Sequence, residues 1–183
     1  MRVLALRNRQ RVQVLNTPLL RQIILHLLHN EFAVKEYELG FHFVPAMEMA
    51  RVNQQFLQHE GSTDVITFDY MQVGASAGDS ADFDPRAASA RSQTDAPMLS
   101  GEIFISVQDA VAQAKEFGTT WQSELTRYAI HGLLHLRGYD DLQSAKRKLM
   151  KREENRLLRK VAATFALRSL AGSGRTSETA RHS

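Results

Sequence analysis

The chain has 183 residues, of which 43% are hydrophobic and 23% are charged, and its formal net charge is +3. It contains no cysteine, which excludes disulfide bonds, thiolate zinc sites, iron–sulfur clusters and cysteine nucleophiles. No apolar run approaches the roughly 20 residues that a membrane-spanning helix requires, and the N-terminal residues lack the ordered regions of a signal peptide. We expect a soluble, cytoplasmic protein with no membrane partner.

The N-terminal part of the chain predicts two strands and a helix. Residues 2–7 and 10–15 each alternate between apolar and polar side chains, which predicts two short strands. Thr17 and Pro18 follow with the pattern of an N-cap and a proline at the first helical position. Apolar residues then recur at helical spacing through residues 18–30, which predicts an amphipathic helix.

The next part of the chain predicts two strands with a helix between them. Residues 37–44 alternate and are rich in aromatic side chains, which is typical of a strand, and residues 45–58 have an apolar helix face. Residues 64–70 are β-branched or aromatic and predict another strand. Residues 74–97 are rich in Ala, Ser, Asp and Gly, so we expect a flexible insertion there. That insertion could be a lid, a partner-binding loop or a linker without a specific role.

A strand and a capped helix follow the insertion. Residues 102–106 form a β-branched and aromatic run that predicts a strand. Ser106 has the chemistry of an N-cap for a helix over residues 107–117, and Gly118 is placed to end that helix.

The C-terminal part of the chain predicts two more helices and a tail. The first helix covers residues 123–137 and is closed by Gly138, and the second is a long basic helix over residues 142–170. Residues 171–183 are rich in Ser, Gly, Thr and Arg, and we expect a disordered tail. Because helices and strands are mixed without regular alternation, the pattern favours an α+β fold over a doubly wound sheet.

The positive charge is unevenly distributed along the chain. Residues 1–30 carry five arginines and no acidic residue, and residues 142–170 carry nine lysines and arginines against Glu153 and Glu154. Clustered positive charge favours an anionic partner such as RNA, although a solvated helix face has the same pattern. We predict that five residues of the second cluster contact RNA phosphates: Lys146, Arg147, Lys148, Lys151 and Arg152.

A candidate metal site lies at the end of the predicted helix over residues 123–137. His131 and His135 are four residues apart, which places both rings on one helix face, although such pairs are usually accidental. Two imidazoles at that spacing can bind one divalent ion at about 2.0–2.1 Å. Because Gly138 lets the chain reverse, the carboxylate of Asp140 or Asp141 could be a third ligand. Three protein ligands and one open position are typical of a catalytic zinc site.

The motif of residues 131–141 also has a family resemblance. It reads HGLLHLRGYDD and resembles the HGxLHLxGYDH signature of the YbeY family at every position except the last. Residues 53–56 with 62–68, and residues 99–106, resemble two upstream blocks of that family. Four residues stand where the family's final helix has similar residues: Met150, Glu154, Leu157 and Leu158. The resemblance covers residues 2–158.

This resemblance implies both a fold and a function. It implies one domain over residues 1–170, with several helices packed on one small mixed sheet. The YbeY family consists of bacterial endoribonucleases, so the resemblance implies a metal-dependent, single-strand-specific endoribonuclease that acts in small-subunit rRNA maturation and ribosome quality control. It further implies one Zn²⁺ ion as cofactor. The implied partners are single-stranded rRNA and small-subunit ribosomal proteins, with no DNA.

One departure from the family pattern concerns the metal ligands. Asp141 stands where the family has its third zinc-binding histidine. We predict that His131, His135 and Asp141 hold the ion and that Asp140 supports this site from outside the ligand set. An aspartate ligand lowers the charge of the centre from roughly +2 to roughly +1, which weakens its effect on bound water and on a phosphoryl oxygen.

A second departure concerns phosphate binding. Leu57 stands where the family usually has an arginine, and a leucine side chain cannot bind a phosphate or stabilise developing charge. Arg51, His59 and Arg137 are candidates to replace that arginine, and we regard Arg137 and His59 as weak candidates for a catalytic role.

The sequence leaves the mechanism and two alternative functions open. The nucleophile would be a zinc-bound water or the 2′-hydroxyl of the RNA, and no general base can be assigned. One alternative is a ribosome-assembly factor that keeps the fold and binds RNA with weakened or no catalysis. A zinc peptidase is disfavoured because Gly132 stands where the HExxH pattern has its glutamate.

Overall fold

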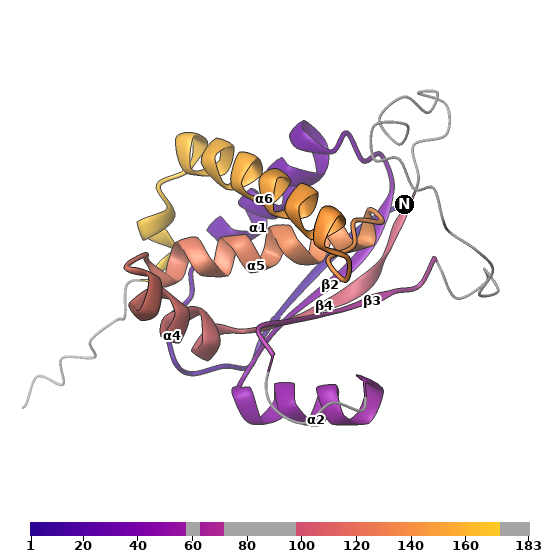
Figure 1. The fold of residues 1–183 in the computed structure, drawn as a ribbon. Coiled ribbons are helices and arrows are strands. Elements are labelled where there is room, and N and C mark those ends of the chain that lie inside the picture. Colours follow the sequence, from indigo (N-terminus) through magenta and orange to yellow (C-terminus); the bar gives the residue numbers. More distant parts are fainter. Residues whose placement is uncertain (58–62, 72–97, 173–183) are drawn as a thin grey trace, which may run out of the picture.

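The computed structural model describes residues 1–57, 63–71 and 98–172. The described residues form one α+β unit in which five α-helices pack on a single four-stranded sheet (Figure 1). This confirms the predicted fold class and the small mixed sheet. The predicted insertion at 74–97 lies outside the described residues, as do residues 173–183 of the predicted tail.

The sheet contains three parallel strands and one antiparallel edge strand. Its strands are β1 (Arg2–Asn8), β2 (Tyr37–Val44), β3 (Val65–Asp69) and β4 (Leu99–Ser106). They lie in the order β1-β2-β4-β3, and β3 pairs antiparallel with β4 at the edge. The first three strands match the predicted ranges closely. The predicted start of the fourth strand at Glu102 is wrong, because Leu99 already pairs with Tyr37 of β2.

The helices lie mainly on one face of the sheet. They are α1 (Thr17–His26), α2 (Ala46–Leu57), α4 (Val107–Phe117), α5 (Trp121–Leu136) and α6 (Ser144–Thr164), with short helical turns η1 (Leu27–Glu31) and η3 (Leu167–Leu170). Helices α1, α5 and α6 cover one face, whereas α2 lies against the other (Figure 1). The main core lies between the sheet and α1, α5 and α6. Among the described residues, no helix has the length and apolar character needed to cross a membrane.

Several helix ends follow from their capping residues. The hydroxyl of Ser106 accepts a hydrogen bond from the Asp109 amide at 3.2 Å, and Gly118 ends α4 with a φ of 65°. Both caps confirm the prediction. The predicted cap at Thr17 is wrong by one residue, because the side chain of Asn16 accepts a hydrogen bond from the Leu19 amide at 3.1 Å.

Predicted boundaries are wrong by two residues or more in three helices. The first helix changes to a wider π-type turn after His26. Helix α5 begins at Trp121, two residues early, because Thr120 caps it. Helix α6 ends at Thr164, well before residue 170, because the backbone at Phe165 is extended.

Residues 10–15 do not form the predicted strand. The buried side chain of Gln10 accepts hydrogen bonds from the amides of Val12 and Gln13 at 2.8 and 3.0 Å. These local bonds satisfy the amides of Val12 and Gln13, which would otherwise have to pair with the carbonyls of a neighbouring strand. The segment therefore folds as a loop. Only Leu15 forms a bridge, with Ala171, and the Gly172 amide donates to the carbonyl of Val14 at 2.8 Å. The first two residues of the predicted tail are therefore paired with this loop.

Candidate metal site

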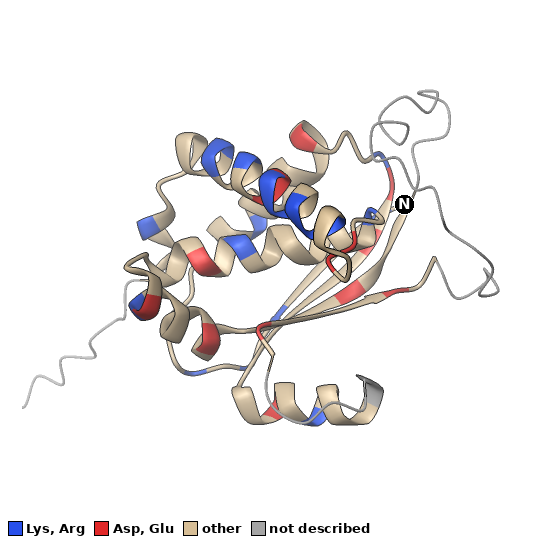
Figure 2. Ribbon diagram, viewed as in Figure 1, with Lys and Arg blue, Asp and Glu red and all other residues tan. Residues whose placement is uncertain are grey.

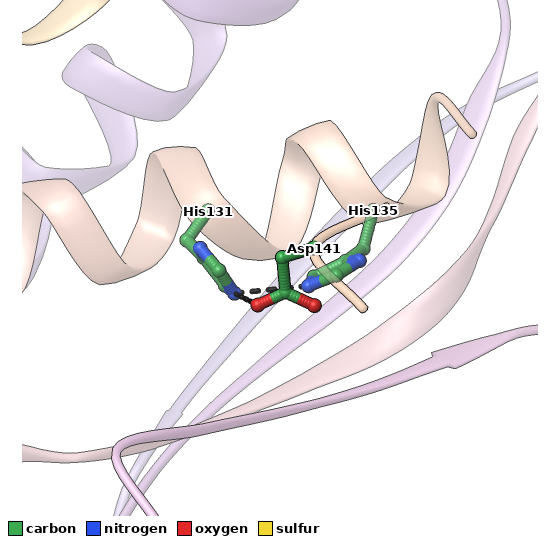
Figure 3. A group of neighbouring side chains, drawn as sticks. All are labelled: His131, His135 and Asp141. Atoms are coloured by element: carbon green, nitrogen blue, oxygen red, sulfur yellow. Dashed lines mark hydrogen bonds and ion pairs between the residues drawn. The ribbon is translucent and has the colours of Figure 1, made fainter. Parts of the chain in front are cut away.

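Helix α5 carries the two histidines of the candidate site on one side of its C-terminal half (Figure 3). The rings of His131 and His135 are nearly perpendicular, with centroids 4.5 Å apart and an interplanar angle of 79°. Their Nε2 atoms are 2.9 Å apart. The two rings thus lie on the same helix face, as their four-residue spacing predicts.

Each ring is fixed through its other nitrogen. The Nδ1 atom of His131 lies 2.6 Å from Oε1 of Glu154, which is buried on α6. The Nδ1 atom of His135 lies 3.1 Å from the carbonyl oxygen of Tyr139, in the turn after α5. An oxygen acceptor at Nδ1 orients an imidazole and selects the form whose Nε2 can bind a metal.

The convergence of the two Nε2 atoms fits a cation between them. With both protons on Nδ1, the Nε2 lone pairs of His131 and His135 face each other at 2.9 Å and repel. A shared proton or a metal ion removes that repulsion. Nitrogens bound to one tetrahedral ion at about 2.0–2.1 Å lie roughly 3.3–3.4 Å apart. The rings would therefore need to separate by only roughly half an ångström to hold a zinc ion.

Asp141 brings a carboxylate to the same place. Gly138, with a φ of 83°, lets the chain reverse after α5. Oδ2 of Asp141 then lies 4.0 Å from Nε2 of His131, and one donor atom from each of the three residues lies within 4.8 Å of the others. Two imidazole nitrogens and a carboxylate oxygen are a donor set that zinc accepts, so the residues present fit such an ion.

The surroundings separate the pKa values of the two histidines. Burial disfavours charge on His131, but the hydrogen bond and the charge of Glu154, with a contribution from Asp141, outweigh burial and raise its pKa. Burial and the positive charge of His131 together lower the pKa of His135. A proton shared by the pair therefore favours His131 over His135, and a divalent ion would compete with that proton.

Gly132 lets α5 lie directly on the sheet. A Cβ atom at this position would lie 2.6 Å from Cγ2 of Ile103 on β4, well inside van der Waals contact. The face of α5 that carries Gly132 is therefore packed on the sheet, while the two histidines lie on another face. A glutamate at this position, as in the HExxH peptidase pattern, would collide with β4.

The other predicted site residues lie in different surroundings. The carboxylate of Asp140 accepts a hydrogen bond from the Leu142 amide at 2.9 Å, so its positioning contact is with the turn rather than with an imidazole. The guanidinium of Arg137 lies 4.5 Å from the ring centroid of Phe32 and donates to the Phe32 carbonyl, which directs it away from the cluster. Arg51 is exposed on α2, on the opposite face of the sheet (Figure 1). His59 and the side chain of Leu57 lie outside the described part of the structure.

Lysines and arginines recur along α6 (Figure 2). Lys148, Lys151 and Arg152 are exposed there. Lys146 has an acidic neighbour, because its ammonium lies 3.6 Å from a carboxylate oxygen of Asp140. The exposed guanidinium of Arg147 donates to the carbonyl of Asp141 at 2.8 Å, which ties α6 to the turn that carries the third donor.

A cavity of about 400 Å³ lies beside the histidines, between α4, α5 and the first half of α6. His131 and Asp141 line it together with Phe117, the last residue of α4. Arg147 and Lys151 line it from α6. The candidate metal site therefore opens onto a space large enough for a small ligand.

Glu154 is a residue of the candidate site that the sequence patterns did not identify. It lies 23 residues after His131, on another helix, and helical spacing on α6 gives no sign of the contact. Arg127 extends the network, because its guanidinium lies 3.5 Å from Oε2 of Glu154 and 2.7 Å from Oδ1 of Asn155. The one available signal was the resemblance of Glu154 to a residue of the family's final helix.

Comparisons with known proteins place the chain in a family. The model of the family described as "Endoribonuclease YbeY" matches residues 5–162. The chain belongs to the YbeY family. The family resemblance seen in the motif of residues 131–141 is thereby confirmed.

Curated members of the YbeY family align with most of the chain. The Endoribonuclease YbeY of Bacteroides thetaiotaomicron is 36% identical over 121 residues, which are 66% of this chain and 72% of the relative. The Endoribonuclease YbeY of Salinibacter ruber is 31% identical over 143 residues, or 78% of this chain and 81% of the relative. The solution structure of TM1509 from Thermotoga maritima, at 20% identity, has a TM-score of 0.57 and covers 95% of this chain and 99% of that one. This last likeness concerns the fold alone.

Proposed function

We propose that this chain is a metal-dependent endoribonuclease in which His131, His135 and Asp141 hold one divalent ion. We expect this ion to be Zn²⁺. The observation that carries the proposal is the convergence of two Nε2 atoms at 2.9 Å while both Nδ1 atoms face oxygen acceptors. Membership of the YbeY family, whose model is described as an endoribonuclease, supports RNA as the substrate.

The residues around the ligands have separate roles in this proposal. A divalent ion would supply a Lewis acid that polarises a phosphoryl oxygen and acidifies water. Glu154 and the carbonyl of Tyr139 orient the two imidazoles, so that little reorganisation is needed when the ion binds. Asp140 and Arg147 hold the turn that carries Asp141.

The substrate in this proposal is single-stranded rRNA of the small ribosomal subunit, cleaved in the cytoplasm during rRNA maturation and ribosome quality control. Small-subunit ribosomal proteins would be the partners. The exposed cations of α6 support an RNA substrate, because phosphate contacts supply most of the sequence-independent affinity for nucleic acid. Lys146, Arg147, Lys148, Lys151 and Arg152 are the proposed contacts, with Lys146 weakened by its pairing with Asp140.

The proposal is tested by metal analysis and RNA cleavage on the same preparations. We expect purified wild-type protein to retain about one zinc ion per chain and to cleave an unstructured RNA with added zinc. The double variant His131→Ala/His135→Ala should lose both properties. His29→Ala, which removes a histidine of η1 outside the cluster, is the matched control and should keep both. Equal, slow release of fragments by wild type and the double variant would exclude the hydrolase.

A second candidate function is a ribosome-assembly factor that binds RNA with weakened or no catalysis. Two residues favour it. Asp141 replaces a neutral ligand of the family pattern with a carboxylate, and Leu57 replaces an arginine. This function predicts RNA binding that a chelator leaves unchanged, together with cleavage no faster than that of the double histidine variant.

A further inference from the structure

We propose that the cavity between α4, α5 and α6 binds a single unpaired nucleotide of the RNA, with Phe117 stacking on its base and with Arg147 and Lys151 binding its phosphate. The inference extends the proposed function, because the same cavity is lined by His131 and Asp141. It assigns a substrate-binding role to Phe117, which the reaction itself does not require.

Phe117 is suited to stacking on a base. It is the last residue of α4, and 64% of its surface is exposed although it is a large apolar side chain. Gly118 turns the chain away immediately after it, in the left-handed conformation that ends the helix. An exposed aromatic ring beside a charged cavity is a common platform for unpaired bases, because every base has a π-face.

Arg147 and Lys151 provide the phosphate contacts from α6. They lie four residues apart on α6 and therefore on the same helix face, and both line the cavity. Arg147 donates only to backbone carbonyls, those of Asp141 and Leu142, and no acidic partner of Lys151 is found in the described part of the chain. Both cations thus retain charge for an anion, in a cavity that is also lined by Asp64, Glu124, Asp141 and Glu154. Arg159, exposed on the same helix, does not line the cavity and provides a comparison.

Tyr128 adds a polar group to the cavity wall. Its side chain is buried, and its hydroxyl has no hydrogen-bond partner among the residues that the structure describes. Burial, followed by the nearby charge of Asp64, raises the pKa of Tyr128, so the hydroxyl keeps its proton. A buried hydroxyl without a partner is unfavourable. The hydroxyl is itself inaccessible from the cavity, so a nucleotide would bond to it only after a local rearrangement.

The size of the cavity limits the occupant. A volume of about 400 Å³ is near the lower end of small-ligand sites, which matches one nucleotide rather than a base pair. A base that enters the cavity to stack on Phe117 cannot remain paired with a complementary strand. The cavity therefore supplies a physical reason for a preference for single-stranded RNA.

The test measures binding separately from cleavage. A single-stranded RNA hexamer containing 2-aminopurine is titrated with full-length protein in EDTA, and both its anisotropy and the quenching of 2-aminopurine fluorescence are followed. We expect Phe117→Ala to weaken binding about 5- to 150-fold and to remove the quenching, because stacking on one base is lost. Phe117→Trp should preserve both signals. Tyr70→Ala, which removes an exposed aromatic residue outside the cavity, is the matched control and should bind normally.

The cation contacts are tested by salt dependence. Lys151→Ala should reduce the slope of log affinity against log salt by about 0.7, the value for one phosphate contact with a single strand. Arg159→Ala, which removes an exposed cation of α6 outside the cavity and outside the proposed RNA contacts, should change the slope less. Unchanged binding and quenching by a folded Phe117→Ala protein would overturn the proposal, as would equal competition by a duplex of the same sequence.

The outcome also separates this inference from the proposed function. Quenching that depends on Phe117 without any cleavage by the metal-loaded protein would support the nucleotide site and reject the endoribonuclease. Cleavage that depends on His131 and His135 but is unaffected by Phe117→Ala, together with unchanged quenching, would support the endoribonuclease and reject the nucleotide site.

Discussion

Replacing Glu154 with glutamine tests how the candidate site is held together. The carboxylate of Glu154 contacts His131 through one oxygen, at 2.6 Å, and Arg127 through the other, at 3.5 Å. Glutamine has nearly the same size and still offers one oxygen acceptor, so Glu154→Gln removes the negative charge while preserving the packing. We expect the variant to fold and to bind zinc more weakly.

The size of the effect follows from the burial and the contact. Glu154 is 7% exposed, so solvent screens its charge poorly. Loss of a group that orients a metal-binding imidazole typically lowers metal affinity by about 10- to 100-fold. Because glutamine keeps the acceptor, we expect the lower end of that range, about tenfold or about 1.4 kcal/mol of binding free energy. Arg127 also loses a charged partner, so we expect the free energy of unfolding to fall by about 1 kcal/mol.

Zinc affinity is measured by competition with a chromogenic chelator, and folding by circular dichroism and denaturant titration. The matched control is Glu153→Gln. Glu153 lies next to Glu154 on α6 but pairs with Arg156 at 2.6 Å. Its substitution should therefore leave zinc affinity unchanged. Zinc affinity within twofold of wild type in folded Glu154→Gln protein would refute the reasoning. An equal loss of zinc affinity in the Glu153→Gln variant would show that the effect comes from the net charge of the protein and not from the contact with His131.

The other predictions concern the third ligand, the helix contact and the link between η1 and α6. Asp141→His should tighten zinc binding and raise any RNA cleavage, since a neutral ligand leaves the centre more positive. Gly132→Ala should lower the free energy of unfolding by about 1–2 kcal/mol, because the new Cβ meets Ile103 at 2.6 Å and only part of that cost is offset by helix propensity. Glu31→Gln should destabilise the protein by about 1 kcal/mol or less at neutral pH. Burial raises the pKa of Glu31, but Lys160 and the other basic neighbours of Glu31 outweigh burial, so the pKa is lowered. The stabilisation from its charge is therefore present above about pH 4.5 and is lost as the pH falls through the lowered pKa.

Each of these predictions has a contrary result. Weaker zinc binding by a folded Asp141→His protein would show that the aspartate is matched to this site or lies outside it. An unchanged denaturation midpoint for Gly132→Ala would show that α5 and β4 adjust without strain. For Glu31→Gln, a stability difference that persists undiminished at about pH 3 would mean that the charge of Glu31 is not its source.

The fold could be predicted where local patterns agree with tertiary packing. The alternating aromatic run of β2 and the capped helix α4 were recognisable, because their own residues supply both the apolar face and the end signals. The segment at 10–15 alternates just as clearly, yet it forms a loop. Its backbone donors are satisfied by the side chain of Gln10, and an alternating pattern contains no information about such a bond.

The candidate site could be predicted only where its parts are close in sequence. His131, His135 and Asp141 lie within eleven residues, so a helix followed by a turn is enough to bring them together. Glu154 depends on how α6 crosses α5, which no local pattern specifies. Arg137 lies in the same short motif but faces Phe32, since it follows the last residue of α5 and its direction is set by packing against η1.

The contact between α6 and His131 has a consequence for the newly made chain. Synthesis runs from the N-terminus, so both imidazoles and the acid after them leave the ribosome before the glutamate that holds the first ring in place. A truncated chain that stops before Glu154 would contain all three side chains of the candidate site but would lack the acceptor that orients His131. The orientation of His131 seen here is therefore complete only once α6 has docked on α5.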